Sequence, residues 1–308
     1  MIFDILLIIA GVAMVLFGAD RLTEGASALA RRMNIPEIVI GLTIVAAGTS
    51  APELFVSLVS ALKGTPDMAV GNVVGSNTMN AMLIVGCAAM VAPMSISRST
   101  VRKDIPFSVA ASVLLILLGL DAFLGRLDGI ILLAGFAAFM YYTLSQAKSE
   151  TATTETTKQI NPWLSACFVI LGLALLVIGS NVFVDSASRV AYSLGVSEGV
   201  VGLTIVAGGT SLPELATSVV AARKGQSAIA IGNVIGSNVF NILLILGTTA
   251  VISPLAIQGI TPIDLSVMLL SVALVWLFSR TRYTVERWEG ALLVAAYLVY
   301  LGWLLYNV

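Results

Sequence analysis

Glu53 and Glu214 are the two residues whose type and spacing point most clearly to chemistry. Each ends the same motif, GTSAPE or GTSLPE, inside an otherwise apolar stretch. The segments 41–80 and 202–241 that contain them correspond without a gap at an offset of 161 positions. A match of this length indicates an internal repeat. Because two nearby carboxylates repel each other unless a cation neutralises them, the duplication favours cation binding.

Local sequence suggests how the chain holds each glutamate. Gly-Thr-Ser is poor helix interior, and the proline that follows lacks a backbone donor. We therefore expect the helix to break there and to restart with Ser50 or Ser211 as N-cap. The glutamate then has the spacing of a capping box, so an alternative is that Glu53 and Glu214 only cap half-helices. A neutral glutamine would cap equally well without placing a charge in an apolar setting.

The same break would free backbone carbonyls beside the carboxylates. Unwound carbonyls next to a carboxylate are hard oxygen ligands, which suit Ca²⁺ or Na⁺. The carbonyls in question belong to Ala46, Ala47, Thr49, Ala207, Gly208 and Thr210.

A second motif, GNVVGSNTMN or GNVIGSNVFN, adds amide and hydroxyl oxygens in each copy. Ser76 and Asn80 are four residues apart and therefore share one helix face. Two interpretations compete, namely ion ligation and hydrogen bonding between helices. Ligation is favoured for Ser76, Asn80, Ser237 and Asn241, which can face the glutamates. Both interpretations stay open for Asn72, Asn77, Asn233 and Asn238.

Composition indicates whether the segments that carry these motifs lie in water or in a lipid bilayer. Of 308 residues, 58% are hydrophobic and 11% are charged, whereas a soluble domain has roughly 25% charged residues. The sequence therefore predicts an all-α integral membrane protein. The net charge of -1 gives no indication of nucleic-acid binding, and the absence of histidine removes imidazole ligands. Cys87 and Cys167 lie in apolar spans and are interpreted as packing residues.

Ten apolar segments are long enough to span a bilayer. They cover about 2–30, 37–63, 68–92, 104–121, 126–146, 162–188, 198–222, 228–252, 263–279 and 288–306.

A polar linker, residues 148–161, divides the chain into repeat 1 (1–147) and repeat 2 (162–308), with five predicted spans each. An odd number of spans makes the second repeat enter the membrane from the opposite side. We therefore expect inverted repeats, with helices 2, 3, 7 and 8 broken. Both glutamates fall near the middle of their spans, so one central site is predicted. A charge at that depth costs at least about 2.5–3.5 kcal/mol, which is usually tolerated for function.

Basic residues orient this arrangement. Arginines and lysines gather in the loops after odd-numbered spans, whereas the even-numbered loops hold only Lys63, Arg126 and Arg189. The positive-inside rule then places the odd loops in the cytoplasm and both termini outside. The N-terminus lacks a basic leader and a cleavage site, so it is interpreted as a retained first span. The predicted location is the plasma membrane or a bacterial inner membrane.

The paired motifs GTSAPE with GNVVGSN and GTSLPE with GNVIGSN resemble the two α-repeats of the sodium/calcium exchangers of the cation/Ca²⁺ antiporter superfamily. The similarity extends to the ten-span plan, and the short linker is similar to that of prokaryotic members. The resemblance implies alternating access, with spans one and six sliding as the gate. Three Na⁺ for one Ca²⁺ is the usual stoichiometry of the family.

The resemblance also implies roles for residues. Ca²⁺ would bind Glu53, Glu214 and the carbonyls of Thr49 and Thr210. Na⁺ sites would use the positions of Ala46, Ser50, Ser76, Ala207, Ser211 and Ser237. Some members carry aspartate at the position of Asn241, whereas this chain has asparagine at both Asn80 and Asn241. That departure argues against K⁺ co-transport.

Several alternatives stay open at this stage. Ca²⁺ exchange could be coupled to H⁺ or K⁺ instead of Na⁺, and a cation channel is a second class. An intramembrane enzyme is disfavoured because no nucleophile–base pair accompanies the acids. No cofactor is expected beyond the transported ions Ca²⁺ and Na⁺. The expected partners are these ions and the lipid bilayer, with no obligate protein partner evident.

Overall fold

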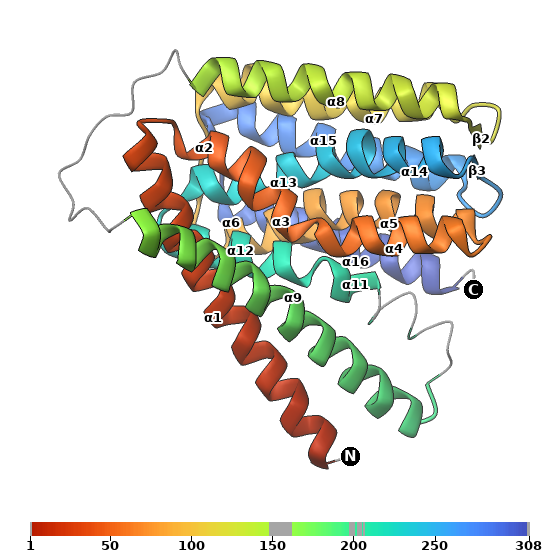
Figure 1. Ribbon diagram of the computed structural model, residues 1–308, viewed down its shortest axis with the longest axis horizontal. Coiled ribbons are helices and arrows are strands. Elements are labelled where there is room, and N and C mark those ends of the chain that lie inside the picture. Colours follow the sequence, from red (N-terminus) through yellow and green to blue (C-terminus); the bar gives the residue numbers. More distant parts are fainter. Residues whose placement is uncertain (1, 148–161, 197–200, 202–204, 206, 307–308) are drawn as a thin grey trace.

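The structure is a computed structural model that describes residues 2–147, 162–196 and 207–306, together with residues 201 and 205. Helices make up nearly all of it (Figure 1). The predicted linker and the start of the predicted seventh span lie largely outside the described residues. In the first half the elements are α1 (Ile2–Met33), α2 (Glu37–Ile40), η1 (Gly41–Val45), α3 (Ala46–Thr49), α4 (Ala51–Leu62), α5 (Pro66–Met79), η2 (Asn80–Ile84), α6 (Val85–Val91), β1 (Met94–Ser95), η3 (Thr100–Asp104), α7 (Ile105–Leu118), β2 (Phe123–Leu124) and α8 (Arg126–Ala147).

The second half repeats this order after residue 161. Its described elements are α9 (Pro162–Ser193), α11 (Ala207–Thr210), α12 (Leu212–Arg223), α13 (Ser227–Val239), η5 (Phe240–Leu246), α14 (Gly247–Ile252), β3 (Leu255–Ala256), α15 (Pro262–Arg282), β4 (Thr284–Val285) and α16 (Arg287–Tyr306).

Length and composition mark this as a multi-pass membrane protein. Within the described residues, seven helices are long and apolar enough to cross a membrane. An eighth span is counted if the bent pair Glu37–Thr49 and Ala51–Leu62 forms one crossing. The predicted fourth span corresponds to η3 with α7, which is not among these helices. The count of ten spans therefore stays a prediction.

The interruption predicted for the third and eighth spans is wrong. Pro66–Val91 and Ser227–Ile252 each run as one continuous helix. Each contains a π-helical segment instead, η2 in the first and η5 in the second. A π-helical turn widens the helix without ending it, so the backbone groups stay bonded within the helix. Asn80 opens η2, and Asn241 lies within η5.

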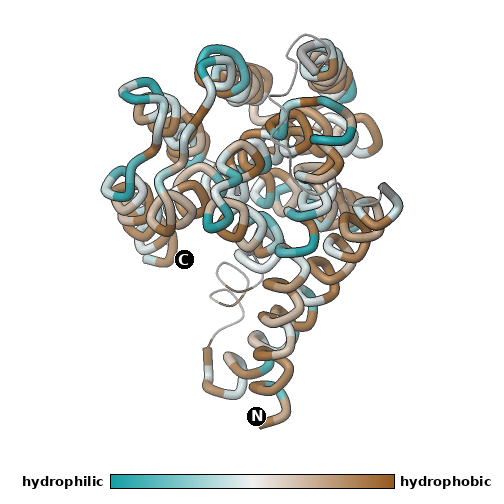
Figure 2. Tube along the Cα trace, turned by 90° about the vertical axis from the view of Figure 1, so that its left-hand side faces the viewer, coloured by the Kyte–Doolittle hydropathy of each residue, from teal (hydrophilic) through white to brown (hydrophobic). Residues whose placement is uncertain are grey.

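Helices α1 and α9 lie side by side and extend obliquely away from the other helices (Figure 1). Hydrophobic residues dominate the long helix that ends at the N-terminus (Figure 2). Glycines allow the two backbones to approach closely. A Cβ added to Gly18 would lie 2.9 Å from the carbonyl oxygen of Gly172, and one added to Gly11 would lie 2.8 Å from that of Gly179.

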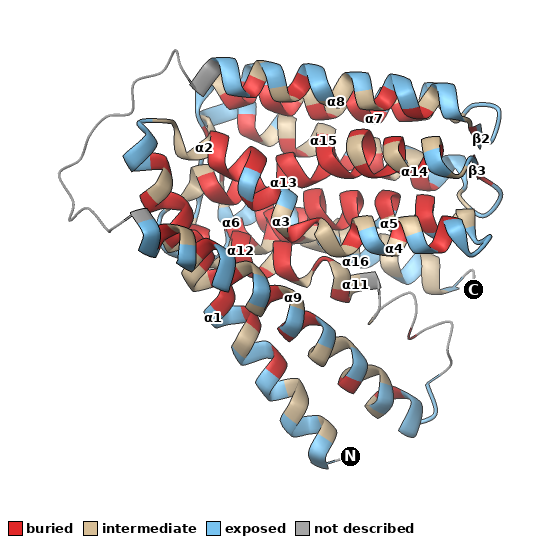
Figure 3. Ribbon diagram, viewed as in Figure 1, coloured by how far each residue is buried: buried red, intermediate tan, exposed pale blue. Residues whose placement is uncertain are grey.

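The buried core lies around α5 and α13, and the outer helices present their exposed sides (Figure 3). The apolar window of Ser227–Ile252 is 94% buried, whereas that of Arg287–Tyr306 is 17% buried. The second of these helices thus has the exposure of a lipid-facing span. The duplicated motifs occupy the most enclosed part of the molecule.

Two short strand pairs join the halves reciprocally. Strand β1 pairs antiparallel with β4, so that Met94 faces Val285. Strand β2 pairs antiparallel with β3, so that Leu124 faces Leu255. The two pairs exchange places when 161 is added to the first-half numbers, since Met94 corresponds to Leu255 and Leu124 to Val285. Equivalent segments therefore make equivalent contacts across the molecule.

Candidate cation site

The predicted helix break occurs at Ser50. Its φ of -82° and ψ of 4° end α3, and the chain bends by 45° before α4 continues. Ser211 has nearly the same conformation, with φ -89° and ψ 7°, between α11 and α12. A proline follows in the first turn of each new helix. Both serines thus hold the N-cap positions that the sequence predicts.

The serine side chains do not cap their own helices. Instead, Ser50 Oγ donates to Glu214 Oε1 at 3.1 Å. Reciprocally, Ser211 Oγ donates to Glu53 Oε1 at 3.1 Å. The capping-box interpretation is therefore wrong, because each hydroxyl at a break contacts the glutamate of the other repeat. These two bonds bring the breaks and the glutamates into one cluster.

The prediction of a free carbonyl at Ala46 is also wrong in this structure. That oxygen accepts from the backbone N–H of Ser50 at 2.9 Å. The bend is gentle enough for the last turn of α3 to keep its bond. In the second copy, Ala207 and Thr210 are the first and last residues of α11. Thr210 has an interaction partner, and the side chain of Ala207 lies outside the described residues.

Both glutamates are completely buried, with 0% exposure. Ser76, Ser237, Asn80 and Asn241 are also buried, on α5, α13, η2 and η5, which contact the helices that carry the glutamates. Ser76 Oγ lies 3.2 Å from Ser211 Oγ, within hydrogen-bond distance, which joins the second motif of repeat 1 to the break of repeat 2.

Five of these buried oxygens have no hydrogen-bond partner among the described residues. They are Glu53 Oε2, Glu214 Oε2, Asn80 Oδ1, Asn241 Oδ1 and Ser237 Oγ.

An unpaired buried polar atom costs about 1–3 kcal/mol, and more when the group is charged. Carboxylate, amide and hydroxyl oxygens are the ligands that Ca²⁺ and other hard cations take from proteins. Within the described part of the chain, no three or more His, Cys, Asp or Glu side chains are placed to hold a metal ion together. The donor set therefore consists of two carboxylates with neutral oxygens, which suits Ca²⁺ or Na⁺ better than a transition metal.

Asn72 and Asn233 hold the helices that carry the glutamates. Asn72 Nδ2 donates to the Glu53 carbonyl at 3.2 Å and to Ser57 Oγ at 3.0 Å. Asn233 Nδ2 makes the same two bonds to the Glu214 carbonyl, at 3.3 Å, and to Ser218 Oγ, at 3.0 Å. For these two asparagines the structure favours the helix-joining interpretation.

Sequence reasoning missed Ser57 and Ser218. They are serine in both copies and 161 positions apart, which is the signal that could have identified them. Thr49 adds a contact between the repeats, because its Oγ1 donates to Asn233 Oδ1 at 2.9 Å.

Charged groups lie outside this cluster, on α1. Arg21 pairs with Glu24 at 3.0 Å. The sequence did not predict that Lys224 Nζ lies 2.6 Å from Asp20 Oδ1. This contact joins α1 to the end of α12.

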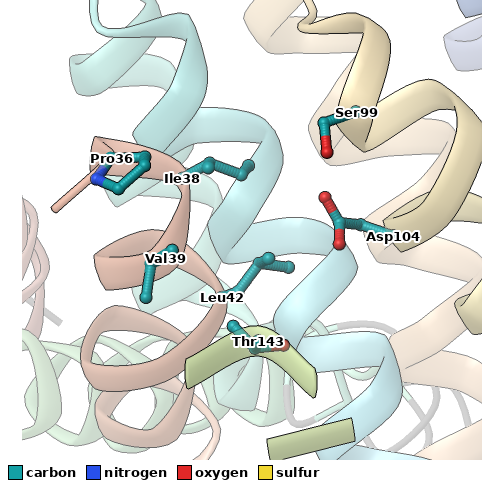
Figure 4. Close-up of a pocket in the computed structure, with 7 residues that line it drawn as sticks. All are labelled: Pro36, Ile38, Val39, Leu42, Ser99, Asp104 and Thr143. Carbon is teal, nitrogen blue, oxygen red and sulfur yellow. The ribbon is translucent and has the colours of Figure 1, made fainter. Parts of the chain in front are cut away.

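A separate small pocket of about 20 Å³ lies between α2, η1, η3 and α8. Figure 4 shows Ser99 and Asp104 on one side, facing an apolar wall from Pro36 to Leu42, with Thr143 below. Neither glutamate lines this pocket. It is therefore distinct from the candidate cation site.

Comparisons with known proteins identify the family of this chain. The family model described as "Sodium/calcium exchanger protein" matches residues 3–145 and again 164–306. The sodium/calcium exchanger MaX1 of Methanosarcina acetivorans is 31% identical, over 98% of this chain and 99% of its own length. The inner membrane protein YrbG of Escherichia coli K12 is 38% identical, over 97% of this chain and 95% of its own length.

Solved structures show the same fold. A structure of the sodium-calcium exchanger NCX_Mj, soaked with 2.5 mM Na⁺ and 1 mM Sr²⁺, superposes with a TM-score of 0.87. It is 30% identical in sequence, and the alignment covers 98% of both chains.

Proposed function

Because this chain belongs to the sodium/calcium exchanger family, we propose that it exchanges Na⁺ for Ca²⁺ through one site built around Glu53 and Glu214. The family consists of transporters, and no catalytic family is indicated. The reciprocal hydrogen bonds between Ser50 and Glu214 and between Ser211 and Glu53 carry the proposal. They join both glutamates into one buried cluster with unpaired oxygens.

The charge of this cluster suits alternating occupation by the two ions. Two ionised carboxylates are balanced by one Ca²⁺ or by two Na⁺, so binding of one ion opposes binding of the other. The proposed ligand set is the one predicted from the sequence, with the carbonyls of Thr49 and Thr210 included. It comprises Ala46, Thr49, Ser50, Glu53, Ser76, Asn80, Ala207, Thr210, Ser211, Glu214, Ser237 and Asn241. Ala46 would bind through the second lone pair of its carbonyl oxygen, because the first accepts from the Ser50 N–H.

The repeat explains how such a site would face either side of the membrane. Reciprocal contacts of equivalent residues are what a two-fold relation between the halves produces. With five spans in each half, that two-fold axis lies in the membrane plane and the repeats are inverted. Rocking or sliding of α1 and α9 against the remaining helices would then expose the site alternately. In this topology both termini lie on the non-cytoplasmic side.

Ion fluxes in reconstituted vesicles test the proposal. Vesicles containing the purified protein and loaded with Na⁺ are diluted into Na⁺-free buffer with Ca²⁺, and parallel samples carry a K⁺ or a pH gradient instead. We expect the outward Na⁺ gradient to drive Ca²⁺ uptake. If only a pH or K⁺ gradient drives uptake, the coupling ion is H⁺ or K⁺ and not Na⁺. Ca²⁺ flux that persists without any counter-ion would identify a channel and contradict the proposal.

A further inference from the structure

We propose that Asn77 and Asn238 are positioning residues that orient the side-chain amides of Asn80 and Asn241, so that both present oxygen to the cation. This inference rests on the proposed cation site, to which Asn77 and Asn238 are not themselves assigned as ligands. The sequence left their role open between ligation and helix joining. We assign them a third role, which is to determine which end of the Asn80 and Asn241 side-chain amides faces the cation.

The four asparagines form a closed network between the two repeats. Asn77 Nδ2 donates to the backbone carbonyl of Asn238 at 3.1 Å, and Asn238 Nδ2 donates to that of Asn77 at 3.5 Å. Asn241 Nδ2 donates to Asn77 Oδ1 at 3.0 Å, and Asn80 Nδ2 donates to Asn238 Oδ1 at 3.0 Å. All four side chains are buried, with exposures of at most 2%.

The backbone carbonyls determine the direction of every amide in this network. A carbonyl oxygen only accepts, so the end of the Asn77 amide that faces Asn238 must be its NH₂ group. The other end of Asn77 is then oxygen, and Asn241 must meet it with NH₂. The oxygen of Asn241 is thereby turned away from Asn77. The same reasoning runs from the Asn77 carbonyl through Asn238 to Asn80.

This direction matters because the two ends of an amide have opposite polarity. Asn80 Oδ1 and Asn241 Oδ1 are two of the five unpaired buried oxygens of the candidate site. If either amide turned by half a rotation, NH₂ hydrogens would take the place of that oxygen. Hydrogen-bond donors repel a cation, so the ion would lose a ligand and meet an opposing dipole.

A substitution that removes the orienting oxygen tests the inference. In Asn77→Leu, Asn241 loses the acceptor for its NH₂ group. We expect the dissociation constant for Ca²⁺ to rise at least about 10-fold, which corresponds to about 1.4 kcal/mol. The measurement is titration calorimetry of the purified full chain in detergent, with Ca²⁺ alone as ligand.

The same substitution in an Asn241→Asp background separates orientation from helix joining. Aspartate presents oxygen at both ends, so its usefulness to the cation does not depend on which way it turns. Asn77→Leu should therefore change the dissociation constant by less than about 3-fold in this background, or about 0.6 kcal/mol. An equal loss of affinity in both backgrounds would show that Asn77 only joins helices, and would overturn the inference.

Asn72→Leu is the matched control. Asn72 lies on the same helix, and its side-chain amide donates to the Glu53 carbonyl and to Ser57, not to Asn80 or Asn241. Its effect on Ca²⁺ affinity should be the same with Asn241 or aspartate present. If Asn241→Asp restored Ca²⁺ affinity to Asn72→Leu as fully as to Asn77→Leu, the restored affinity would not depend on amide orientation. The inference would then fail.

The repeat supplies an independent version of the test. The reciprocal half of the network is tested with Asn238→Leu, alone and combined with Asn80→Asp. These variants replace those at Asn77 and Asn241 if Asn77→Leu does not yield folded protein. Rescue by aspartate is the expected result here as well. Absence of Ca²⁺ binding by the unaltered protein would contradict the proposed function itself. Loss without rescue would contradict only the orienting role.

Discussion

The serine–glutamate bonds at the centre of the molecule are reciprocal between the repeats, whereas two contacts by which α9 and α1 meet the remaining helices have no repeat counterpart. At the centre, Ser50 and Ser211, Glu53 and Glu214 make the same bonds at the same distance in both directions. Around it, Ser180 Oγ of α9 donates to the Gly209 carbonyl at 2.7 Å. The equivalent residue of α1 is Ala19, which has no hydroxyl.

A second contact differs in the same way. Lys224, at the end of α12, pairs with Asp20 of α1 at 2.6 Å. Its repeat counterpart is Lys63, at the end of α4, and the counterpart of Asp20 is Asn181. Lys63 makes no ion pair within the described residues. Residues of the site are identical in the two copies, whereas Ser180 of α9 and Asp20 of α1, which contact the remaining helices, differ from their repeat counterparts.

This difference separates two requirements of an exchanger. The ions must meet the same ligands from either side of the membrane, which an exact internal repeat provides. Movement between two states requires contacts that form in one state and break in the other. Contacts that lack a repeat counterpart are the candidates for that role, and the structure shows them on α1 and α9.

Loss of a carboxylate should have the largest effect and should be the same on both sides. We expect Glu53→Gln and Glu214→Gln each to reduce Na⁺-driven Ca²⁺ uptake at least about 100-fold, since breaking a buried charged arrangement costs about 3–5 kcal/mol. Uptake by reconstituted vesicles is the measurement, and the exposed Asp121→Asn is the control. Full uptake by both glutamine variants would show that the site is misplaced.

Removal of the crossing hydroxyls should come next. Ser50→Ala and Ser211→Ala each delete a hydrogen bond to a carboxylate, worth about 1.5–3 kcal/mol. We expect each to weaken Ca²⁺ binding about 10-fold or more by the same arithmetic. Titration with Ca²⁺ measures both. A large loss of Ca²⁺ affinity in one variant with none in the other would contradict the equivalence of the two serines.

A smaller and one-sided effect is expected at Ser180. Ser180→Ala removes a neutral hydrogen bond, worth about 0.5–1.5 kcal/mol. Because this bond joins α9 to Gly209 in α11, just before the break at Ser211, its loss should change the uptake rate about 2- to 10-fold. Ca²⁺ affinity should stay near that of the unaltered protein, because Ser180 is not a ligand. A change in affinity as large as that of Ser211→Ala would place Ser180 in the site instead.

The smallest effect is expected at the ion pair. Partly exposed pairs contribute about 0–1 kcal/mol, so Lys224→Met should alter the uptake rate by at most about 5-fold. The effect should shrink at high salt, which screens such pairs. Lys63→Met is the matched control and should have less effect. Equal effects of the two variants at low salt would contradict the asymmetry.

Much of this arrangement could be predicted from sequence because the repeat is exact where the chemistry lies. The position of the helix break follows from Gly-Thr-Ser and the proline after it. The gathering of both motifs follows from their shared offset. The hydrogen-bond partners of the serine hydroxyls could not be predicted. The spacing of Ser50 and Glu53 fits a local capping box as well as it fits a contact between the repeats. Only packing of the repeats decides that Ser50 reaches Glu214.

Two other features also depend on packing. The continuous helices through Asn80 and Asn241 follow from π-helical segments, for which the sequence carries no evident signal. The network of Asn77 and Asn238 depends on which backbone carbonyl of the other repeat lies opposite each amide. Such contacts span more than a hundred positions of the chain, so periodicity and motif spacing do not reveal them.

The most direct test of the account is competition between Na⁺ and Ca²⁺ for the purified protein. Equilibrium binding of radioactive Ca²⁺ is measured while Na⁺ is raised, for the unaltered chain, Glu53→Gln and Glu214→Gln. The account predicts that Na⁺ displaces Ca²⁺ from the unaltered chain and that either variant loses Ca²⁺ binding. Ca²⁺ binding that withstands both Na⁺ and the two substitutions would contradict it.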